Sequence, residues 1–180
     1  VMKRRYFVAS IMAGGMLATL VPGSAVGRDI RRFHDLSVPS QALGPLERAP
    51  EWWRQRISAE AWRILFEEGT ERAYSSPLDK QTSNGTYVCS ACHLPLFTSD
   101  TKYDSGTGWP SFWTVEERHI DTKTDYRALW PRTEYHCVRC GGHQGHVFDD
   151  GPEPTGKRWC NNGLALKFIP ESEALPALRG

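Results

Sequence analysis

Five cysteines are the residues of this sequence whose type and spacing could do chemistry, and four of them form two pairs. Two residues separate Cys89 from Cys92, and two separate Cys137 from Cys140. A turn of this length points both sulfurs at one ion, and two such turns supply the four thiolates of a tetrahedral zinc site. We therefore predict one structural Zn²⁺ that leaves no coordination position for substrate. Two disulfides, which oxidising compartments favour, and a single redox-active pair are the alternatives.

Cys160 is left without a partner at that spacing, and we predict that it is a nucleophile. It lies in the polar segment Gly156–Gly163, in or beside a strand. Arg158, two residues earlier, favours the thiolate, which is the form that reacts. A buried packing cysteine is the alternative, but such cysteines seldom have Arg, Asn and Gly as neighbours.

Two histidines and several aromatic residues are candidates for the rest of a site. His143 and His146 follow the second cysteine pair in a glycine-rich turn, where an imidazole could donate a proton; a metal-ligand or surface role is the alternative. Aromatic side chains on loops either pack on the core or line a pocket. We expect Trp109, Phe112 and Phe148 to line a substrate pocket.

The elements that must position these residues are mainly β-strands. A helix is predicted to start at Ser58, with apolar residues near helical spacing, and to end at Gly69. Downstream, short runs rich in Val, Thr, Tyr, Phe and Trp alternate with Gly, Asp, Asn and Pro clusters, a pattern of strands joined by tight turns. The predicted strands are residues 86–89, 111–115, 126–130, 134–138, 146–149 and 164–169.

The N-terminal part of the chain differs in composition from the rest. Residues 1–27 have a basic start, an apolar run and small residues, which predicts an export signal, and Arg4-Arg5 resembles the twin-arginine form. We expect export to a bacterial periplasm; a tether through an uncleaved N-terminal segment is the alternative. The apolar run is short and interrupted by glycine, so no stable membrane span is expected in the mature protein.

Residues 28–56 are polar and contain three prolines, so we interpret them as a linker that carries no core of its own. The folded domain is predicted at 57–180. The whole chain has 22 basic and 21 acidic residues, and three of the basic ones fall in the predicted signal. The remainder is slightly acidic, which argues against nucleic-acid binding, and we expect a monomer.

Four linked motifs resemble, in order and spacing, those of the B-type methionine-R-sulfoxide reductases. They are Cys-x-x-Cys, Ser-Gly-Thr-Gly-Trp-Pro-Ser-Phe, Cys-x-x-Cys-Gly-Gly-His-x-Gly-His-Val-Phe-Asp-Asp-Gly-Pro and Gly-x-Arg-Trp-Cys-x-Asn. The likeness runs from about Ile57 to Pro170. It implies two antiparallel sheets with a short N-terminal helical segment, a zinc site far from the active site, and reduction of the R epimer of methionine sulfoxide, free or in proteins.

The resemblance also implies roles for single residues. Cys160 would be the nucleophile and His146 the acid, with His143 beside it. A cysteine thiolate would attack the sulfoxide sulfur, the acid would protonate the departing oxygen, and the cysteine would remain as a sulfenic acid.

Three further residues are assigned by the same resemblance. Asn162 would orient the thiol or a bound water, Trp109 would hold the substrate methyl group, and Arg158 would support the thiolate. The alternatives are a turn residue for Asn162 and a surface ion pair for Arg158.

The sequence departs from the family at Thr107, where many members carry a resolving cysteine. Trp159 and Gly163 also replace the usual Tyr and Ser, which affects expected pocket polarity more than activity. If the paired cysteines hold zinc, an external thiol must resolve the sulfenic acid, and we expect a one-cysteine cycle fed by a thioredoxin-like carrier. A non-catalytic zinc-ribbon binding module and an S-nitrosothiol or disulfide reductase are the competing functions.

Overall fold

The computed structural model describes residues 36, 38–127 and 130–180. The predicted export signal at 1–27 and the first residues of the predicted linker lie outside this part of the chain. Residues 31–180 form one compact unit. Within the described residues, no helix has the length and apolar character needed to cross a bilayer.

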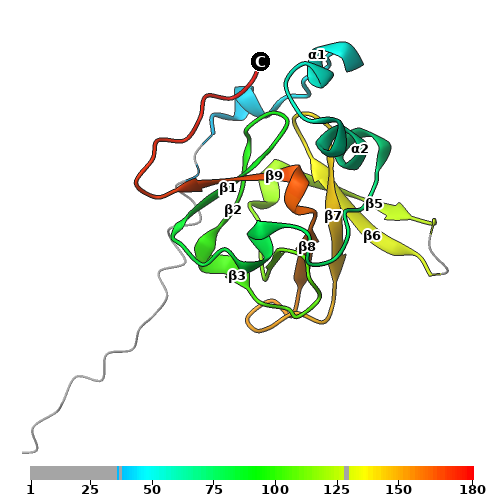
Figure 1. The fold of residues 1–180 in the computed structure, drawn as a ribbon, viewed down its shortest axis with the longest axis vertical. Coiled ribbons are helices and arrows are strands. Elements are labelled where there is room, and N and C mark those ends of the chain that lie inside the picture. The colour runs from blue at the N-terminus through cyan, green and yellow to red at the C-terminus, as the bar shows by residue number, and fades with distance from the viewer. Residues whose placement is uncertain (1–35, 37, 128–129) are drawn as a thin grey trace, which may run out of the picture. The chain divides into compact units, whose positions relative to one another are not determined.

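Two antiparallel sheets form the body of this unit, which confirms the predicted mainly β fold (Figure 1). One sheet has the strand order β2-β1-β9, and the other has the order β3-β4-β8-β7-β6-β5. The strands are β1 (Gly85–Cys89), β2 (Pro95–Thr98), β3 (Lys102–Tyr103), β4 (Ser111–Phe112), β5 (Ile120–Asp125), β6 (Arg132–Cys137), β7 (His143–Phe148), β8 (Arg158–Asn161) and β9 (Leu166–Pro170).

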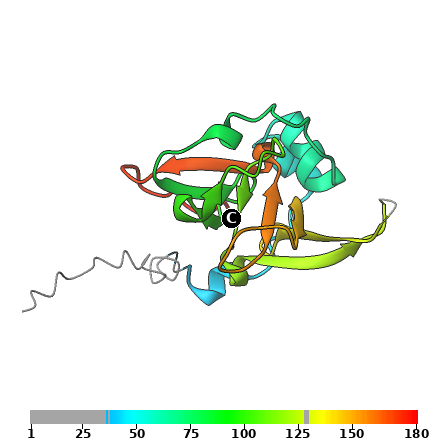
Figure 2. The same ribbon diagram turned by 90° about the horizontal axis from the view of Figure 1, so that it is seen from below.

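Short helices connect and flank these sheets. The α-helices are α1 (Pro50–Arg54) and α2 (Ala59–Glu67); the 3₁₀ turns are η2 (Ser40–Leu43), η3 (Pro77–Lys80), η4 (Ser99–Thr101), η5 (Glu117–His119) and η6 (Gly163–Ala165). Helix α2 packs against β7 and η6, so it supports the strand that carries both candidate histidines. Figure 2 shows the hairpin of β5 and β6 reaching out beyond β7 and β8.

Aromatic side chains from both sheets build the core between them. Phe97 of β2 stacks on Phe112 of β4 with ring centroids 4.0 Å apart, and Tyr87 of β1 meets Phe112 edge-on at 5.0 Å. Tyr135 of β6 meets Phe97 edge-on at 6.3 Å. All four rings are fully buried. Burial of such large apolar surfaces is the main force holding the two sheets together.

The predicted helix after Ser58 is confirmed as α2. The Ser58 side chain accepts a hydrogen bond from the backbone N–H of Ala61 at 3.1 Å, which satisfies a helix N-terminal donor. Ile64 and Leu65 face the core. The helix ends one residue earlier than predicted, because Glu68 rather than Gly69 takes the left-handed conformation, with a φ of 51°.

The described part of residues 28–56, interpreted as a linker, packs against the domain that was predicted to start at residue 57. Trp53 of α1 is only 3% exposed and belongs to the hydrophobic core. Its ring lies 5.4 Å from the ring of Phe66 on α2. The prolines suggested an extended tether, but Pro50 occupies the first turn of α1, where proline is well tolerated.

None of the described residues of the predicted strand 126–130, which are residues 126, 127 and 130, lies in a strand. Tyr126 lies after the end of β5, and both it and Trp130 are highly exposed, at 76% and 78%. The strand that pairs with β6 is instead β5, whose residues are nearly all polar and exposed, so it has no apolar alternation to reveal it. The other predicted strands overlap with β1, β4, β6, β7 and β9, although β4 is only two residues long.

Candidate active site

The candidate nucleophile and acid lie on adjacent strands of the six-stranded sheet and face the same way. Cys160 of β8 is directly opposite His146 of β7 on one side and Ser111 of β4 on the other. Directly opposed residues of antiparallel strands point to the same face of a sheet. The register continues this row across all six strands: Tyr103, Ser111, Cys160, His146, Glu134 and Lys123.

The Cys160 thiol is partly buried and has polar neighbours. Burial raises its pKa above the ordinary value for a cysteine, while the Arg158 charge and hydrogen bonds with Thr107, Arg158 and Ser111 act in the opposite direction. The expected effect of Arg158 is therefore present but outweighed by burial. In the absence of substrate, the thiol form is favoured at neutral pH.

Three hydroxyl groups form a connected network beside this sulfur. Ser105 Oγ lies 2.8 Å from Thr107 Oγ1 and 2.8 Å from Ser111 Oγ, and Ser111 Oγ donates to the carbonyl of Trp109 at 3.0 Å. Thr107 and Ser111 are the two members that contact the thiol. Thr107, at the position of the usual resolving cysteine, is therefore a direct neighbour of Cys160.

Arg158 is fixed by an acidic partner that the sequence reading did not assign to the site. Its Nε and Nη2 atoms donate to the two carboxylate oxygens of Asp150 at 2.8 and 2.9 Å. The Arg158 guanidinium also lies 4.3 Å from the ring centre of Phe148. Arg158 of β8 is paired with Phe148 of β7. Each lies two residues along its strand from Cys160 or His146, so all four side chains share one face of the sheet.

His146 is held by a buried carboxylate from the neighbouring hairpin. Its Nε2 atom lies 2.8 Å from Oδ2 of Asp125 at the end of β5, and the same oxygen accepts from Arg132 Nη2 at 2.6 Å. Burial lowers the pKa of His146, and the hydrogen bond to Asp125 partly offsets this effect. The pKa of Asp125 is depressed, first by the backbone N–H of Arg127 and then by His146 and Arg132.

His143 is more deeply buried than His146 and has its own acidic neighbour. Its side chain is 2% exposed, and its Nδ1 atom lies 2.9 Å from Oε1 of Glu134. The ring centres of His143 and His146 are 5.4 Å apart. Burial lowers the pKa of His143, opposed by Glu134. The structure thus brings both histidines together, with His146 the nearer to Cys160 in the register.

Hydrogen bonds join the Trp109 loop to the segment that contains Glu71 and Tyr74. We call this connection the Trp109 strap. The indole Nε1 of Trp109 donates to the carbonyl of Glu71 at 3.2 Å, and the N–H of Tyr74 donates to the carbonyl of Gly108 at 2.7 Å. Gly108 has a φ of 86° and its added Cβ would overlap Tyr74, so a larger residue there would open the strap. The loop that carries Trp109 also carries Thr107, which contacts the Cys160 thiol.

Asn162 lies close in sequence to Cys160, but its side chain bonds elsewhere. Its Oδ1 accepts from the backbone N–H of Glu71 at 3.0 Å, and its Nδ2 donates to the carbonyl of Gln144 at 3.1 Å. The carboxylate of Glu71 in turn accepts from the N–H groups of Gly163 and Leu164 at 2.6 and 2.9 Å. The described hydrogen bonds of Asn162 therefore tie β7 and β8 to the Trp109 strap.

The assignment of Phe112 to the substrate pocket is wrong. Ser111 faces Cys160, so Phe112, the next residue of the same strand, points to the opposite face of the sheet. Phe112 is fully buried in the aromatic core between the sheets, where it stacks on Phe97. Trp113, the next residue of the chain, is also largely buried, at 9% exposed.

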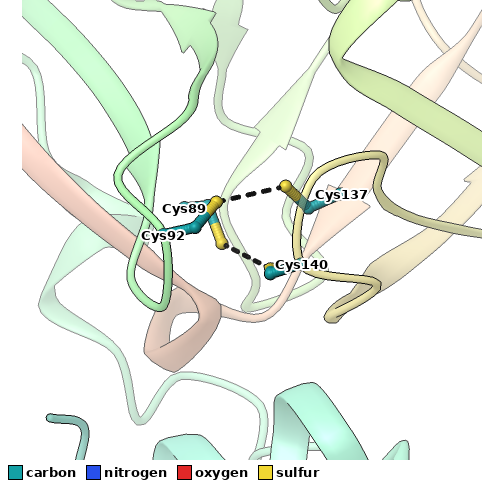
Figure 3. Close-up of side chains that lie close together, drawn as sticks. All are labelled: Cys89, Cys92, Cys137 and Cys140. Atoms are coloured by element: carbon teal, nitrogen blue, oxygen red, sulfur yellow. Dashed lines mark hydrogen bonds between the residues drawn. The ribbon is translucent and has the colours of Figure 1, made fainter. Parts of the chain in front are cut away.

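The four paired cysteines form one compact cluster (Figure 3). Their sulfur atoms all lie within 4.8 Å of one another, with 3.6 Å between Cys89 and Cys140 and 3.5 Å between Cys92 and Cys137. A disulfide bond is about 2.05 Å long, whereas four sulfurs about 2.3 Å from a central zinc are about 3.8 Å apart. All five cysteines are free, so the cluster fits a metal and not two disulfides.

The two cysteine turns have the same backbone geometry. The N–H of His93 donates to the carbonyl of Cys89 at 2.9 Å, and the N–H of Gly141 donates to the carbonyl of Cys137 at 2.9 Å. His93 and Gly141 both have left-handed backbones, with φ values of 64° and 69°. Each cysteine pair is therefore presented by a turn of the same shape, as a shared metal site requires.

Sequence reasoning missed the carboxylates that hold the site together. Asp125 and Glu134 contact the histidines, Asp150 contacts Arg158, and Glu71 anchors Trp109 and Asn162. Asp150 lies in the turn that follows β7, which made a turn role the natural reading. Asp125 lies 21 residues from His146, and Glu71 lies 38 residues from Trp109 and 91 from Asn162, while Glu134 and His143 are on different strands, so no local spacing could have indicated them.

The chain is similar to proteins of one family. The SelR domain model matches residues 57–170, which is the range over which the resemblance was expected. "Peptide methionine sulfoxide reductase MsrB" of Leptospira interrogans is 48% identical over 127 residues, covering 70% of this chain and 97% of that protein. Proteins of the same name from Methanosarcina barkeri and Thiobacillus denitrificans are 45% and 48% identical, covering 71% and 66% of this chain and 91% of each relative.

Proposed function

We propose that this chain, which belongs to the SelR-domain family of methionine sulfoxide reductases of the B type, reduces the R epimer of methionine sulfoxide, free or in proteins. The observation that carries the proposal is the row in which Cys160 has His146 on one side and Ser111 on the other. A nucleophile and an acid on one sheet face can act on the sulfur and the oxygen of one S=O bond.

The proposed reaction begins with attack of the Cys160 sulfur on the electrophilic sulfoxide sulfur. The attack forms a bond between the two sulfurs, and His146 delivers a proton to the sulfoxide oxygen, which leaves as water after a second protonation when the S–O bond breaks. Water then attacks the Cys160 sulfur, the S–S bond breaks with its electron pair going to methionine, one proton is released, and Cys160 becomes a sulfenic acid. Trp109 and Phe148 form apolar walls for the methyl group and side chain of the substrate. Arg158, held by Asp150, supports negative charge on the Cys160 sulfur during attack.

We further propose that the sulfenic acid is resolved by an external thiol. The other four cysteines lie together in the metal cluster, and Thr107 contacts Cys160 where the family often has a cysteine. One thiol displaces water from the sulfenic acid to give a mixed disulfide, and a second thiol releases Cys160 and leaves as the disulfide. A thioredoxin-like dithiol carrier would supply both sulfurs.

The metal cluster supports zinc as its proposed occupant. Four thiolates at these separations suit a tetrahedral, structural Zn²⁺ site held by Cys89, Cys92, Cys137 and Cys140. Zinc would supply cross-linking rather than chemistry, because four protein ligands fill its coordination sphere. Export through residues 1–27 to the periplasm and a monomeric state remain proposals from the sequence.

Replacement of the nucleophile tests the activity. Cys160→Ser should abolish reduction of a peptide carrying methionine-R-sulfoxide, because the hydroxyl is a far poorer nucleophile at neutral pH. The assay should follow each sulfoxide epimer separately, with dithiothreitol as reductant, and should record metal content and melting temperature as controls. Unchanged activity, or equal consumption of both epimers, would contradict the proposal; a binding module would lack activity in the wild type as well.

A cysteine at position 107 tests the one-cysteine cycle. Because the Thr107 side chain contacts Cys160, Thr107→Cys should let the sulfenic acid close an intramolecular disulfide after one turnover. A single turnover should then reduce the free thiols outside the metal cluster from two to none in the variant, and from one to none in the wild type, which should retain a sulfenic acid that dimedone labels. A wild-type chain that forms a disulfide with Cys160 by peptide mapping would refute this cycle. Ser105→Cys is a matched control in the same loop.

A further inference from the structure

The carboxylate of Asp125 receives three hydrogen bonds in a nearly buried position. Its side chain is 7% exposed. Oδ1 accepts from the backbone N–H of Arg127 at 2.9 Å, and Oδ2 accepts from Arg132 Nη2 at 2.6 Å and from His146 Nε2 at 2.8 Å. An ionised carboxylate without such partners would be costly to bury, so the three donors hold it ionised and fix its orientation.

We propose that Asp125 is a positioning residue for the reaction, which holds His146 with its proton on Nε2 and turns Nδ1 toward the sulfoxide oxygen. A carboxylate accepts hydrogen bonds and cannot donate them, so the His146 nitrogen that faces it must carry the proton. Among the described residues, no side chain or backbone group hydrogen-bonds to His146 Nδ1. When the imidazole is protonated on both nitrogens, Nδ1–H is therefore the donor left to deliver a proton to the sulfoxide oxygen, and the Nε2–H tautomer is the neutral form that remains.

The place of Asp125 in the sheet explains how it can perform this task. It lies at the end of β5, on the same face as the row that contains His146, and is paired with Arg132 on β6. The hairpin of β5 and β6 thus brings the carboxylate alongside β7 from a position 21 residues away in sequence. His146 is 12% exposed, so the imidazole has little freedom to turn away from this partner.

The hydrogen-bond inventory makes Asp125→Asn a sharp test. Aspartate offers two acceptor oxygens to three donors, whereas asparagine offers one oxygen and an NH₂ group. If the NH₂ group takes the place of Oδ2, two donors, this group and Arg132 Nη2, face each other, and the opposite tautomer of His146 is favoured. If it takes the place of Oδ1, it faces the N–H of Arg127, which is also a donor. Either arrangement loses the charge that stabilises a protonated imidazole.

Several charged or titratable groups face His146 and set its protonation together with Asp125. Arg132 and Glu134 come from β6, His143 from β7, and Cys160 and Arg158 from β8. Arg132 and His143 disfavour the imidazolium, and Asp125 favours it. Removing the Asp125 charge should therefore lower the pKa of His146 by about one unit or more. The limb of the kcat profile that requires protonated His146 should move to lower pH by the same amount.

The experiment combines NMR of the His146 ring with steady-state kinetics, and the inference rests on the proposed acid role of His146. In the wild type, ¹⁵N shifts should show the Nε2–H tautomer for neutral His146. In Asp125→Asn, that tautomer should lose population and the His146 pKa should fall. We expect kcat for methionine-R-sulfoxide to drop about 100-fold with little change in KM. Asp125→Glu, which keeps the carboxylate, should recover part of kcat.

Asp121→Asn is the matched control, because it makes the same change on the same strand at an exposed position. It should leave the His146 tautomer and the kinetics unchanged. An Nδ1–H tautomer in the wild type, or an Asp125→Asn variant with unaltered His146 titration, would overturn the inference. If Asp125→Asn does not fold, the tautomer of His146 measured by NMR in the wild type decides whether the inference holds. The NMR result does not depend on turnover, so a wild type that fails to reduce either epimer refutes the proposed function separately.

Discussion

At the scale of single residues, the site balances burial against polar contacts. Cys160 is a poor thiolate in the free protein because burial opposes its charge more strongly than Arg158 favours it. The sequence alone pointed to Arg158 as an activator, and its guanidinium does act in that direction. The Arg158 guanidinium, however, also donates two hydrogen bonds to the Asp150 carboxylate, which offsets much of its positive charge.

The titration of Cys160 follows from this balance. Because its pKa lies above the ordinary cysteine value, iodoacetamide should alkylate Cys160 slowly at pH 7 and faster as the pH rises past 9. Arg158→Gln removes a cation next to Cys160. The pKa of the Cys160 thiol should therefore rise further, and the rate of its alkylation at pH 8 should fall several-fold. Peptide mass mapping distinguishes Cys160 from the metal-cluster cysteines. A rate that is already at its plateau at pH 7 would contradict this picture.

At the scale of elements, the two faces of the six-stranded sheet have different tasks. Ser111 and Cys160 lie on the proposed catalytic face, while their chain neighbours Phe112 and Trp159 are paired on the other face. Since side chains alternate along a strand, a shift of one residue would exchange the two sets completely. The register of β4 on β8 therefore determines both the core and the site.

This alternation gives opposite expectations for two phenylalanines. Phe112→Ala should lower the free energy of unfolding by about 3–5 kcal/mol, because it leaves a cavity in the aromatic core. Phe148→Ala, at a half-buried position on the catalytic face, should cost much less stability and should raise KM for the sulfoxide. Urea unfolding and steady-state kinetics measure the two effects. A stable Phe112→Ala variant with an increased KM would restore the pocket role that the structure rejects.

At the scale of the whole molecule, the cysteine cluster joins the two sheets. Cys89 ends β1 and Cys92 lies in the turn that leads to β2, and both strands belong to the three-stranded sheet. Cys137 ends β6 and Cys140 lies in the turn that leads to β7, and both strands belong to the six-stranded sheet. A metal bound by these four sulfurs is thus a cross-link between sheets that otherwise meet through apolar packing.

Metal removal should therefore affect the entire domain. We expect close to one zinc per chain by elemental analysis, and loss of the cooperative thermal transition when a strong chelator removes it, because binding free energy at such sites contributes directly to folding. Cys89→Ser should have the same effect and should also abolish activity indirectly. Full metal loss with an unchanged melting curve would show that apolar packing alone holds the sheets together.

The sequence by itself determined the features that depend on local spacing. The two cysteine pairs, the solitary Cys160, the capped helix at Ser58 and the family motifs can each be recognised within a few residues. The tertiary structure decided which side chains meet across strands: Asp125 with His146, Asp150 with Arg158, and Phe112 with the core rather than the substrate. The physical reason is that the face to which a side chain points, and the side chains it meets, depend on strand pairing and register. Pairing and register are fixed by the packing of strands that are distant in sequence, so the local sequence does not reveal them.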